Sequence, residues 1–361
     1  MKYYYLRIIL FLITFPFAGL MGQSVVFYGC DTQSDTIVVM DTVSQQVVSK
    51  FVVTLAGQTI EKLQGLAWDP IAHETYCVSS LIGQSGRELS KIDLQTGVLT
   101  SVGDLGDRFA SITFRDDGQL MGVTGDGGNI PFTVFLIDKT NASTTLAKTL
   151  GNGDGGELIG FNPDDQMIYH WSGSSNMVFE KFPAYPPYTP LTNIPITNGQ
   201  GVATIASLYI ENGNFITANS SNEILNYATS GSIGSLILAG NFKLHGFVMP
   251  PDFEQVDPAV CVNDTMEMLM TGLAQDTVIY HWGDGSSTSV FPAGGATHTY
   301  SIPGNRLIHV ALSNPSSTDT VASFPATIQP YPGIPIIPGG GDVAVCDTNA
   351  VQLIGPPGGI K

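Results

Sequence analysis

The chain has 361 residues and a formal net charge of −17, and only 12% of its residues are charged, whereas 41 are glycine and 22 are proline. Few charges and many turn-formers exclude helical bundles and coiled coils, and a hydrophobic content of 43% excludes a disordered chain. We expect no nucleic-acid partner, because phosphate binders need clustered basic residues and this chain has 14 against 31 acidic ones.

The first 22 residues have the order of a secretory signal peptide. Lys2 and Arg7 precede an apolar run, residues 8–20, that is shorter than the about 20 residues needed to span a membrane. We expect cleavage before Gln23, with an uncleaved anchor as the alternative. No later segment reaches membrane-spanning length. The sequence therefore predicts a secreted or cell-surface protein without a transmembrane segment after signal removal.

Four cysteines, Cys30, Cys77, Cys261 and Cys346, permit three disulfide pairings in an oxidising compartment. Cys30 and Cys77 occupy equivalent parts of successive repeats, so a bridge between them is one hypothesis. Two buried free thiols are the alternative. No cysteine or histidine spacing suits zinc, and we expect no cofactor of that kind.

Residues 23–252 repeat with a period near 46 residues. Aromatic residues that end an apolar strand and precede a polar turn recur 46, 47 and 48 residues apart, at Trp68, Phe114, Phe161 and Tyr209. A second series of short strands interleaves with them, at residues 37–41, 89–93, 134–138, 178–182 and 224–228. Each repeat therefore holds about four short strands.

Four short strands per repeat are typical of one blade of a β-propeller. A single blade cannot cover both of its faces, and radial stacking buries them. We therefore predict an all-β protein whose residues 23–252 form a propeller-like domain of five or six blades. Residues 243–249 are expected to close the ring by pairing with the N-terminal strands. A flat or irregular β-solenoid is the alternative.

Residues 253–331 resemble a PKD domain, an immunoglobulin-like β-sandwich. The resemblance rests on a Trp, Gly-Asp-Gly turn, His-x-Tyr and Pro-Gly turn in that order, at Trp282, Gly283, Asp284, Gly285, His298, Tyr300, Pro303 and Gly304. The spacing between Trp282 and the glycine turn is shorter than in the family pattern. Asp284-Gly285 suits a tight hairpin and Trp282 an inward anchor, so we interpret Asp284, His298 and Tyr300 as structural residues.

Residues 332–342 form a proline- and glycine-rich linker, for which we expect an extended conformation. Residues 343–349 then echo residues 259–265, which predicts that residues 343–361 are the truncated start of a further immunoglobulin-like domain.

The loop at residues 151–156 matches the Gly-x-Gly-x-x-Gly pattern, but a strand follows it, so we reject dinucleotide binding. The same loop offers oxygen ligands for calcium at Asn152, Asp154 and Glu157, although ordinary turn chemistry also explains it. The proline-rich loop at residues 182–190 carries Tyr185 and Tyr188, whose rings are candidates for stacking on a sugar or peptide. The alternative is a loop that packs on its own domain.

The repeats also resemble those of secreted bacterial propellers, best seen in the Ile-Asp-x-x-Thr-Gly hairpin at residues 92–97. Together with the PKD resemblance, this is similar to large bacterial surface proteins used in adhesion. The resemblance implies a non-catalytic protein delivered by bacterial export machinery that presents a face to an extracellular protein or glycan. No catalytic motif is recognisable. The alternative is a secreted hydrolase or lyase with its active site in the propeller channel or beyond residue 361.

Overall fold

The structure is a computed structural model that describes residues 26–330, except 42–43, 152–155, 174, 199–201, 212, 257, 272–276, 292–293 and 314–317. The regular elements of this part are all strands, β1 to β29. Within it, no helix could cross a membrane. The predicted signal peptide, linker and truncated third domain lie outside the described residues.

The first unit contains five sheets. Each sheet is built from strands that follow one another in the chain, except that a strand from the end of the unit joins the first sheet. One sheet contains β21 (Leu244–Val248), β1 (Val26–Asp31), β2 (Thr36–Asp41) and β3 (Gln46–Val52). The next contains β5 (Ile60–Asp69), β6 (Glu74–Leu81), β7 (Glu88–Ile92), β8 (Val98–Asp104) and the short β4 (Thr54–Leu55). The third contains β9 (Phe109–Phe114), β10 (Leu120–Thr124), β11 (Thr133–Ile137) and β12 (Thr144–Thr149). The fourth contains β13 (Glu157–Asn162), β14 (Met167–Ser172), β15 (Val178–Pro183) and β16 (Thr192–Asn193). The fifth contains β17 (Thr204–Glu211), β18 (Asn214–Asn219), β19 (Glu223–Ala228) and β20 (Ile233–Ala239).

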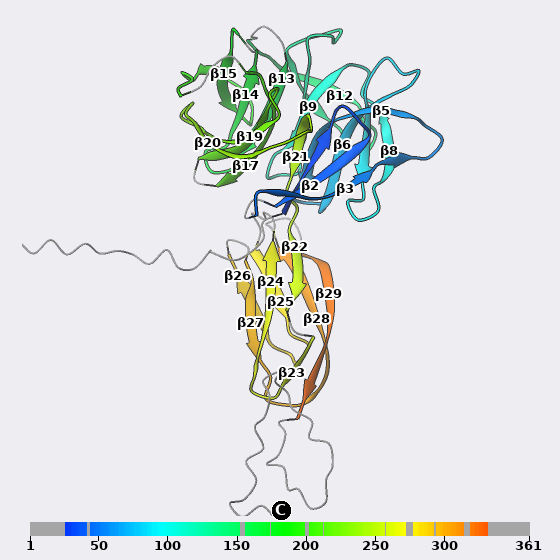
Figure 1. The fold of residues 1–361 in the computed structure, drawn as a ribbon, viewed down its shortest axis with the longest axis vertical. Helices are drawn as coiled ribbons and strands as arrows, with labels where there is room; N and C mark the ends of the chain where they lie inside the picture. Colours follow the sequence, from blue (N-terminus) through cyan, green and yellow to red (C-terminus); the bar gives the residue numbers. More distant parts are fainter. Residues whose placement is uncertain are drawn as a thin grey trace, which may run out of the picture.

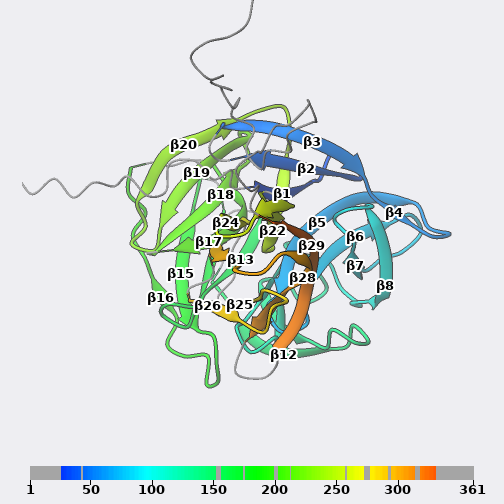
Figure 2. The same cartoon turned by 90° about the horizontal axis from the view of Figure 1, so that it is seen from below.

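The five sheets stand around a common axis, as the two views of Figures 1 and 2 show. The edge strands β5, β9, β13, β17 and β21 face the axis, because residues of all five line the same cavities. This is the propeller-like architecture expected from the repeats, with five sheets. The second series of predicted strands corresponds to β2, β7, β11, β15 and β19, the third position in each sheet.

The ring closes by strand exchange between its two ends. The last strand, β21, pairs antiparallel with β1, with Tyr28 opposite Val248 and Gly29 opposite Phe247. This confirms the pairing predicted for residues 243–249. It also covers the edge of β1, which would otherwise expose unpaired backbone groups.

Neighbouring sheets bury apolar side chains between them. Trp171 of β14 stacks on Phe179 with ring centroids 4.9 Å apart, and both rings meet Tyr227 of the next sheet edge-on. All three side chains are almost fully buried. A sheet in this ring is therefore stabilised by its neighbours and not by its own faces alone.

Cys30 and Cys77 lie buried in one hydrophobic cluster as free thiols. Burial raises the pKa of the Cys30 thiol to about 12, so it stays protonated. Of the two alternatives for this pair, the structure holds the buried thiols and not the bridge.

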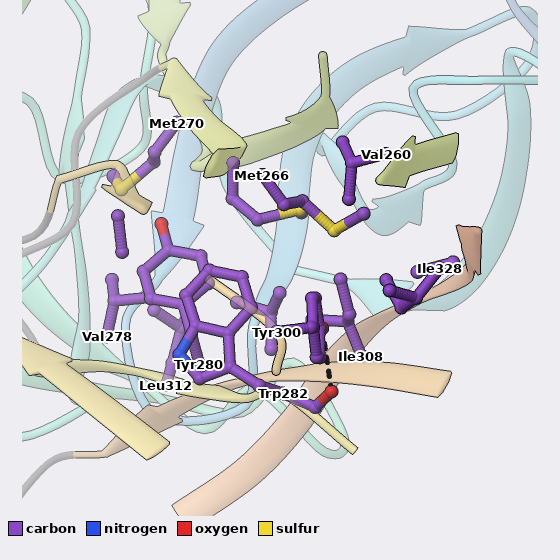
Figure 3. Packing of buried hydrophobic residues seen from close by; sticks show 14 residues of the cluster. Val260, Met266, Met270, Val278, Tyr280, Trp282, Tyr300, Ile308, Leu312 and Ile328 are labelled. Carbon is purple, nitrogen blue, oxygen red and sulfur yellow. Dashed lines mark hydrogen bonds between the residues drawn. The ribbon is translucent and has the colours of Figure 1, made fainter. Parts of the chain in front are cut away.

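The second unit has two sheets with one core between them (Figure 3). One sheet contains β22 (Asp252–Gln255), β24 (Thr265–Thr271) and β27 (Ala296–Thr299). The other contains β23 (Ala259–Cys261), β29 (Thr318–Gln329), β28 (Gly304–Ser313), β25 (Thr277–His281) and β26 (Ser287–Val290). Since β22 pairs with β24, the unit already includes Asp252, which the sequence analysis placed in the ring.

The predicted motif of this unit forms one connected network. The Tyr300 hydroxyl donates to the Trp282 carbonyl at 2.8 Å, and His298 stacks on the Trp282 ring with centroids 4.9 Å apart. His298 Nε2 lies 2.8 Å from Asp284 Oδ2. Burial disfavours the charged carboxylate, but hydrogen bonds from Ser286 and His298 prevail and lower the pKa of Asp284 to about 2. Gly283 and Gly285 have positive φ, as the turn requires. These contacts fit the structural role expected for Asp284, His298 and Tyr300.

The closing strand approaches its neighbour so tightly that only glycine fits. A Cβ on Gly246 of β21 would lie 2.4 Å from the Leu66 nitrogen of β5 and 2.7 Å from the Gly65 carbonyl carbon. We expect Gly246→Ala to lower the free energy of unfolding by about 1–3 kcal/mol, because the two strands must separate. Urea unfolding measures this. Gly234→Ala, in the outer strand β20, is the matched control, and equal stability of the two variants would contradict the prediction.

Candidate functional site

The two ends of the ring's channel differ in chemistry. One end is a largely apolar cavity of about 160 Å³ lined by the four repeated aromatic residues and by Met249, and also by Arg115 and Asp116. Leu312 of β28 lines the same cavity, so this end faces the second unit. Figures 1 and 2 show that unit lying along the axis below the ring. The common placement of Trp68, Phe114, Phe161 and Tyr209 confirms that these residues occupy equivalent positions.

The other end is a polar cavity of about 220 Å³, which we call the polar mouth. It is lined by residues from all five sheets and the adjoining loops: Gln64, Arg87, Arg108, Phe109, Ala110, Gly125, Asp126, Gly127, Gly156, Glu157, Thr204, Ile205 and His245. Two of the chain's five arginines converge here. Convergent ionisable groups in a central cavity make this the candidate site.

The repeat explains why these residues meet. Each axial strand carries one lining residue four positions before its residue at the apolar end: Gln64, Ala110, Glu157, Ile205 and His245. Four strand residues span roughly 13 Å, so the two sets form two layers around one channel. Arg108 immediately precedes β9, and Arg87 immediately precedes β7. The site is thus assembled from loop ends and strand starts that lie far apart in the sequence.

The arginines of the polar mouth have unused hydrogen-bonding capacity. Arg87 is half-buried, and its Nε is buried without a hydrogen-bond partner in the described part of the chain. Gln64 Oε1 is likewise buried and unpaired. Burial lowers the pKa of Arg87, the positive charge of Arg108 lowers it further, and Glu61 partly opposes both effects. The two guanidinium groups therefore repel each other at the mouth.

His245 contributes a neutral ring to the polar mouth. Burial lowers its pKa to about 4, and the positive charges of Lys243 and Lys62 act in the same direction. At neutral pH it can therefore both donate and accept a hydrogen bond without adding charge.

Behind the mouth, Glu157 belongs to a buried cluster of charged side chains on adjacent strands. His170 of β14 contacts Glu157 of β13 through Nε2, and its Nδ1 lies 2.9 Å from Glu180 Oε1 of β15. The Ser172 hydroxyl donates to Glu157 Oε1 at 2.8 Å. Burial opposes protonation of His170, but the two carboxylates prevail and raise its pKa, which favours an imidazolium that donates to both. Burial raises the pKa of Glu157, against the hydrogen bonds from His170 and Ser172.

This arrangement suits binding better than bond cleavage. Glu157 is held by His170 and Ser172, so it is not poised as a general base toward the cavity. Among the described residues, no group of three or more His, Cys, Asp or Glu side chains could hold a metal ion. The polar mouth offers two guanidinium groups and an amide, which recognise anions and hydrogen-bond acceptors.

Of the calcium candidates, Glu157 is buried in the cluster with His170, and Asn152 and Asp154 lie outside the described residues. Calcium binding by this loop stays a prediction.

The candidate tyrosines lie on another part of the ring. Tyr185 and Tyr188 pack beside the hydrophobic cluster between the third and fourth sheets. The Arg115 guanidinium lies 4.2 Å from the centroid of the Tyr185 ring, and the Tyr185 hydroxyl donates to Asp116. These contacts fit the alternative of a loop packed on its own domain, and ligand stacking on either ring stays a prediction.

Four residues of the polar mouth were not predicted from the sequence: Arg87, Arg108, Gln64 and His245. A usable signal was present, because Gln64 and His245 each lie four residues before a residue of the apolar layer, Trp68 and Met249. Arg87 and Arg108 carry no such signal, since loops outside the axial strands supply them.

No family model and no curated protein matches the chain. Among solved structures, a protein of unknown function from Bacteroides caccae has a TM-score of 0.42 at 9% identity, with 62% of this chain and 98% of that chain covered. TolB from Acinetobacter baumannii has a TM-score of 0.42 at 12% identity, covering 85% and 67%. The extracellular domain of a hybrid two-component system from B. thetaiotaomicron has a TM-score of 0.31 at 12% identity, covering 81% and 47%. At these TM-scores and identities, the structural similarity adds nothing to the description of the fold given by the five sheets.

The depressed pKa of His245 predicts a pH-dependent stability. Because the folded state holds the ring neutral, this stabilisation is present above the ordinary pKa of 6.5 and is lost as the pH falls toward 4. We expect a loss of about 3 kcal/mol over that range in the wild type. The His245→Gln variant should not show this loss of stability when its unfolding in urea is measured from pH 7.5 to 4. Parallel curves for the two proteins would refute it.

The cluster around His170 predicts a strong single-residue effect. His170→Ala leaves Glu157 and Glu180 buried without their cation, so we expect a loss of about 3–5 kcal/mol in the free energy of unfolding. His281→Ala, at an exposed position of β25, should change stability by less than about 0.5 kcal/mol. Chemical denaturation measures the free energy of unfolding of both variants. A His170→Ala protein as stable as the His281→Ala control would disprove that His170 compensates the two buried carboxylates.

Proposed function

We propose that the protein is an exported, non-catalytic binding protein whose ring binds an extracellular glycan or protein at the polar mouth. The observation that carries this is the asymmetry of the channel. One end is apolar and faces the second unit, whereas the other gathers Arg87, Arg108 and His245. Arg108 and Asp126 are exposed, so a ligand can reach this end.

In this proposal the second unit is a PKD-like, immunoglobulin-like spacer. It lies on the side of the ring opposite the polar mouth, which supports a role in carrying the ring away from a surface (Figure 1). The dense contacts among Trp282, His298 and Tyr300 are those of a rigid core. Such a unit contributes reach and stiffness to an adhesion-type protein and leaves recognition to the ring.

The proposal is tested by blocking the mouth without changing its charge. Gly127 lies on the rim, and a Cβ there would meet only the flexible Arg108 side chain. We expect the secreted chain to bind members of a panel of neutral and acidic polysaccharides and matrix proteins, and Gly127→Trp to abolish that binding. Leu236→Trp, at an exposed position of the outer strand β20, is the matched control and should bind normally.

Equal binding by both tryptophan variants would place recognition elsewhere and overturn the proposal. Chromatography of the incubated polysaccharides provides a second readout. Shortened products that depend on the polar mouth would favour the secreted hydrolase or lyase instead.

A further inference from the structure

We propose that the polar mouth is a subsite for the carboxylate of a sugar acid, held by Arg87 and Arg108, with its hydroxyl groups toward Gln64, His245 and Asp126. This rests on the proposed function and names the ligand chemistry of the same site. It assigns a hexuronate residue, within an acidic polysaccharide, as the group that enters the cavity.

The cationic side of the mouth favours a bound carboxylate. Arg87 and Arg108 both line a cavity of about 220 Å³, and among the described residues neither guanidinium has a carboxylate partner within ion-pair distance. An unpaired pair of like charges is costly in a partly buried site. A carboxylate between them removes the repulsion and gains charge-assisted hydrogen bonds, which are the strong ones.

The buried, unsatisfied atoms indicate a ligand and not only a surface charge. Nine side-chain atoms of the described residues are buried without a hydrogen-bond partner, and Arg87 Nε and Gln64 Oε1 are the two that belong to residues lining the polar mouth. Buried polar atoms are nearly always hydrogen-bonded in folded proteins. One is a donor and the other an acceptor, so a group that carries both a carboxylate and a hydroxyl satisfies the two together.

The acidic groups of the mouth determine the charge of the anion that it can bind. Asp126 and Glu157 also line the cavity, and Glu157 shares the imidazolium of His170. The net positive charge facing a ligand is therefore small, which favours a monoanion over a dianion such as phosphate. Asp126 and the neutral His245 can accept hydrogen bonds from the several hydroxyls of a sugar ring, whose spacing a single phosphate group does not reproduce.

Isothermal titration calorimetry of the secreted chain at constant ionic strength tests the assignment. The probes are D-glucuronate, D-galacturonate, D-glucose and inorganic phosphate. We expect at least one hexuronate to bind, phosphate to bind more weakly, and glucose not to bind. Arg108→Gln should weaken hexuronate binding at least about tenfold, the effect of losing a charged hydrogen bond. Arg108 is exposed, so this variant should fold as the wild type does.

Arg306→Gln is the matched control, because Arg306 lies in β28 of the second unit and donates to the nearby backbone carbonyls of Asn305 and Ile302. It should bind hexuronate like the wild type. Tighter binding of phosphate than of hexuronate, equal binding of glucose, or no effect of Arg108→Gln would each overturn the carboxylate assignment. If no hexuronate binds while a neutral polysaccharide still binds in a manner sensitive to Gly127→Trp, the carboxylate assignment fails and the proposed binding face stands.

Discussion

The ring depends on the burial of sheet faces against neighbouring sheets. Each four-stranded sheet has apolar residues on both sides, such as Phe182 on one face and Phe179 on the other, and these belong to different clusters. Burial of such side chains is the main favourable contribution to folding, and it is available here only when the sheets stand side by side. When β21 pairs with β1, the first sheet gains its fourth strand and the ring of sheets is closed. The close approach of Gly246 to Gly65 shows how little space the closed ring leaves at this seam.

A closed ring also determines where function can reside. Every axial strand runs in the same direction along the channel, so all strand starts meet at one end and all strand ends at the other. The apolar layer at the strand ends faces the second unit, whose Leu312 lines the same cavity. The layer at the strand starts is left to interact with other molecules. Binding residues on loop ends of a rigid scaffold are the common solution in proteins, because the scaffold fixes their spacing.

Much of the fold could be predicted from the sequence because it rests on periodic features. The spacing of Trp68, Phe114, Phe161 and Tyr209 identified the axial strands, and the apolar residues near 243–249 identified the closing strand. The boundary at Asp252 was displaced because β22 is short and gives no signal of its own.

The candidate site was harder to predict from the sequence than the fold. Arg87 and Arg108 meet because the segment before β7 bonds the segment after β8, with the Arg87 N–H donating to the Asp107 carbonyl at 3.0 Å, and the repeat pattern did not mark that pairing. The proline-rich loop was a candidate binding loop because of its composition. In the structure the Arg115 guanidinium packs on its Tyr185 ring.

The buried cluster of Glu157, His170 and Glu180 connects stability to the site. Three ionisable groups in an apolar interface cost more desolvation than an apolar trio would, and one imidazolium between two carboxylates offsets only part of that cost. Such a cluster is therefore weak evidence for a gain in stability and better evidence for a fixed geometry. Glu157 begins β13 at the polar mouth, and its two oxygens are held by His170 and Ser172. The cluster thus fixes an anionic group of the mouth that the two arginines also line, so that the charge pattern of the site is set before any ligand arrives.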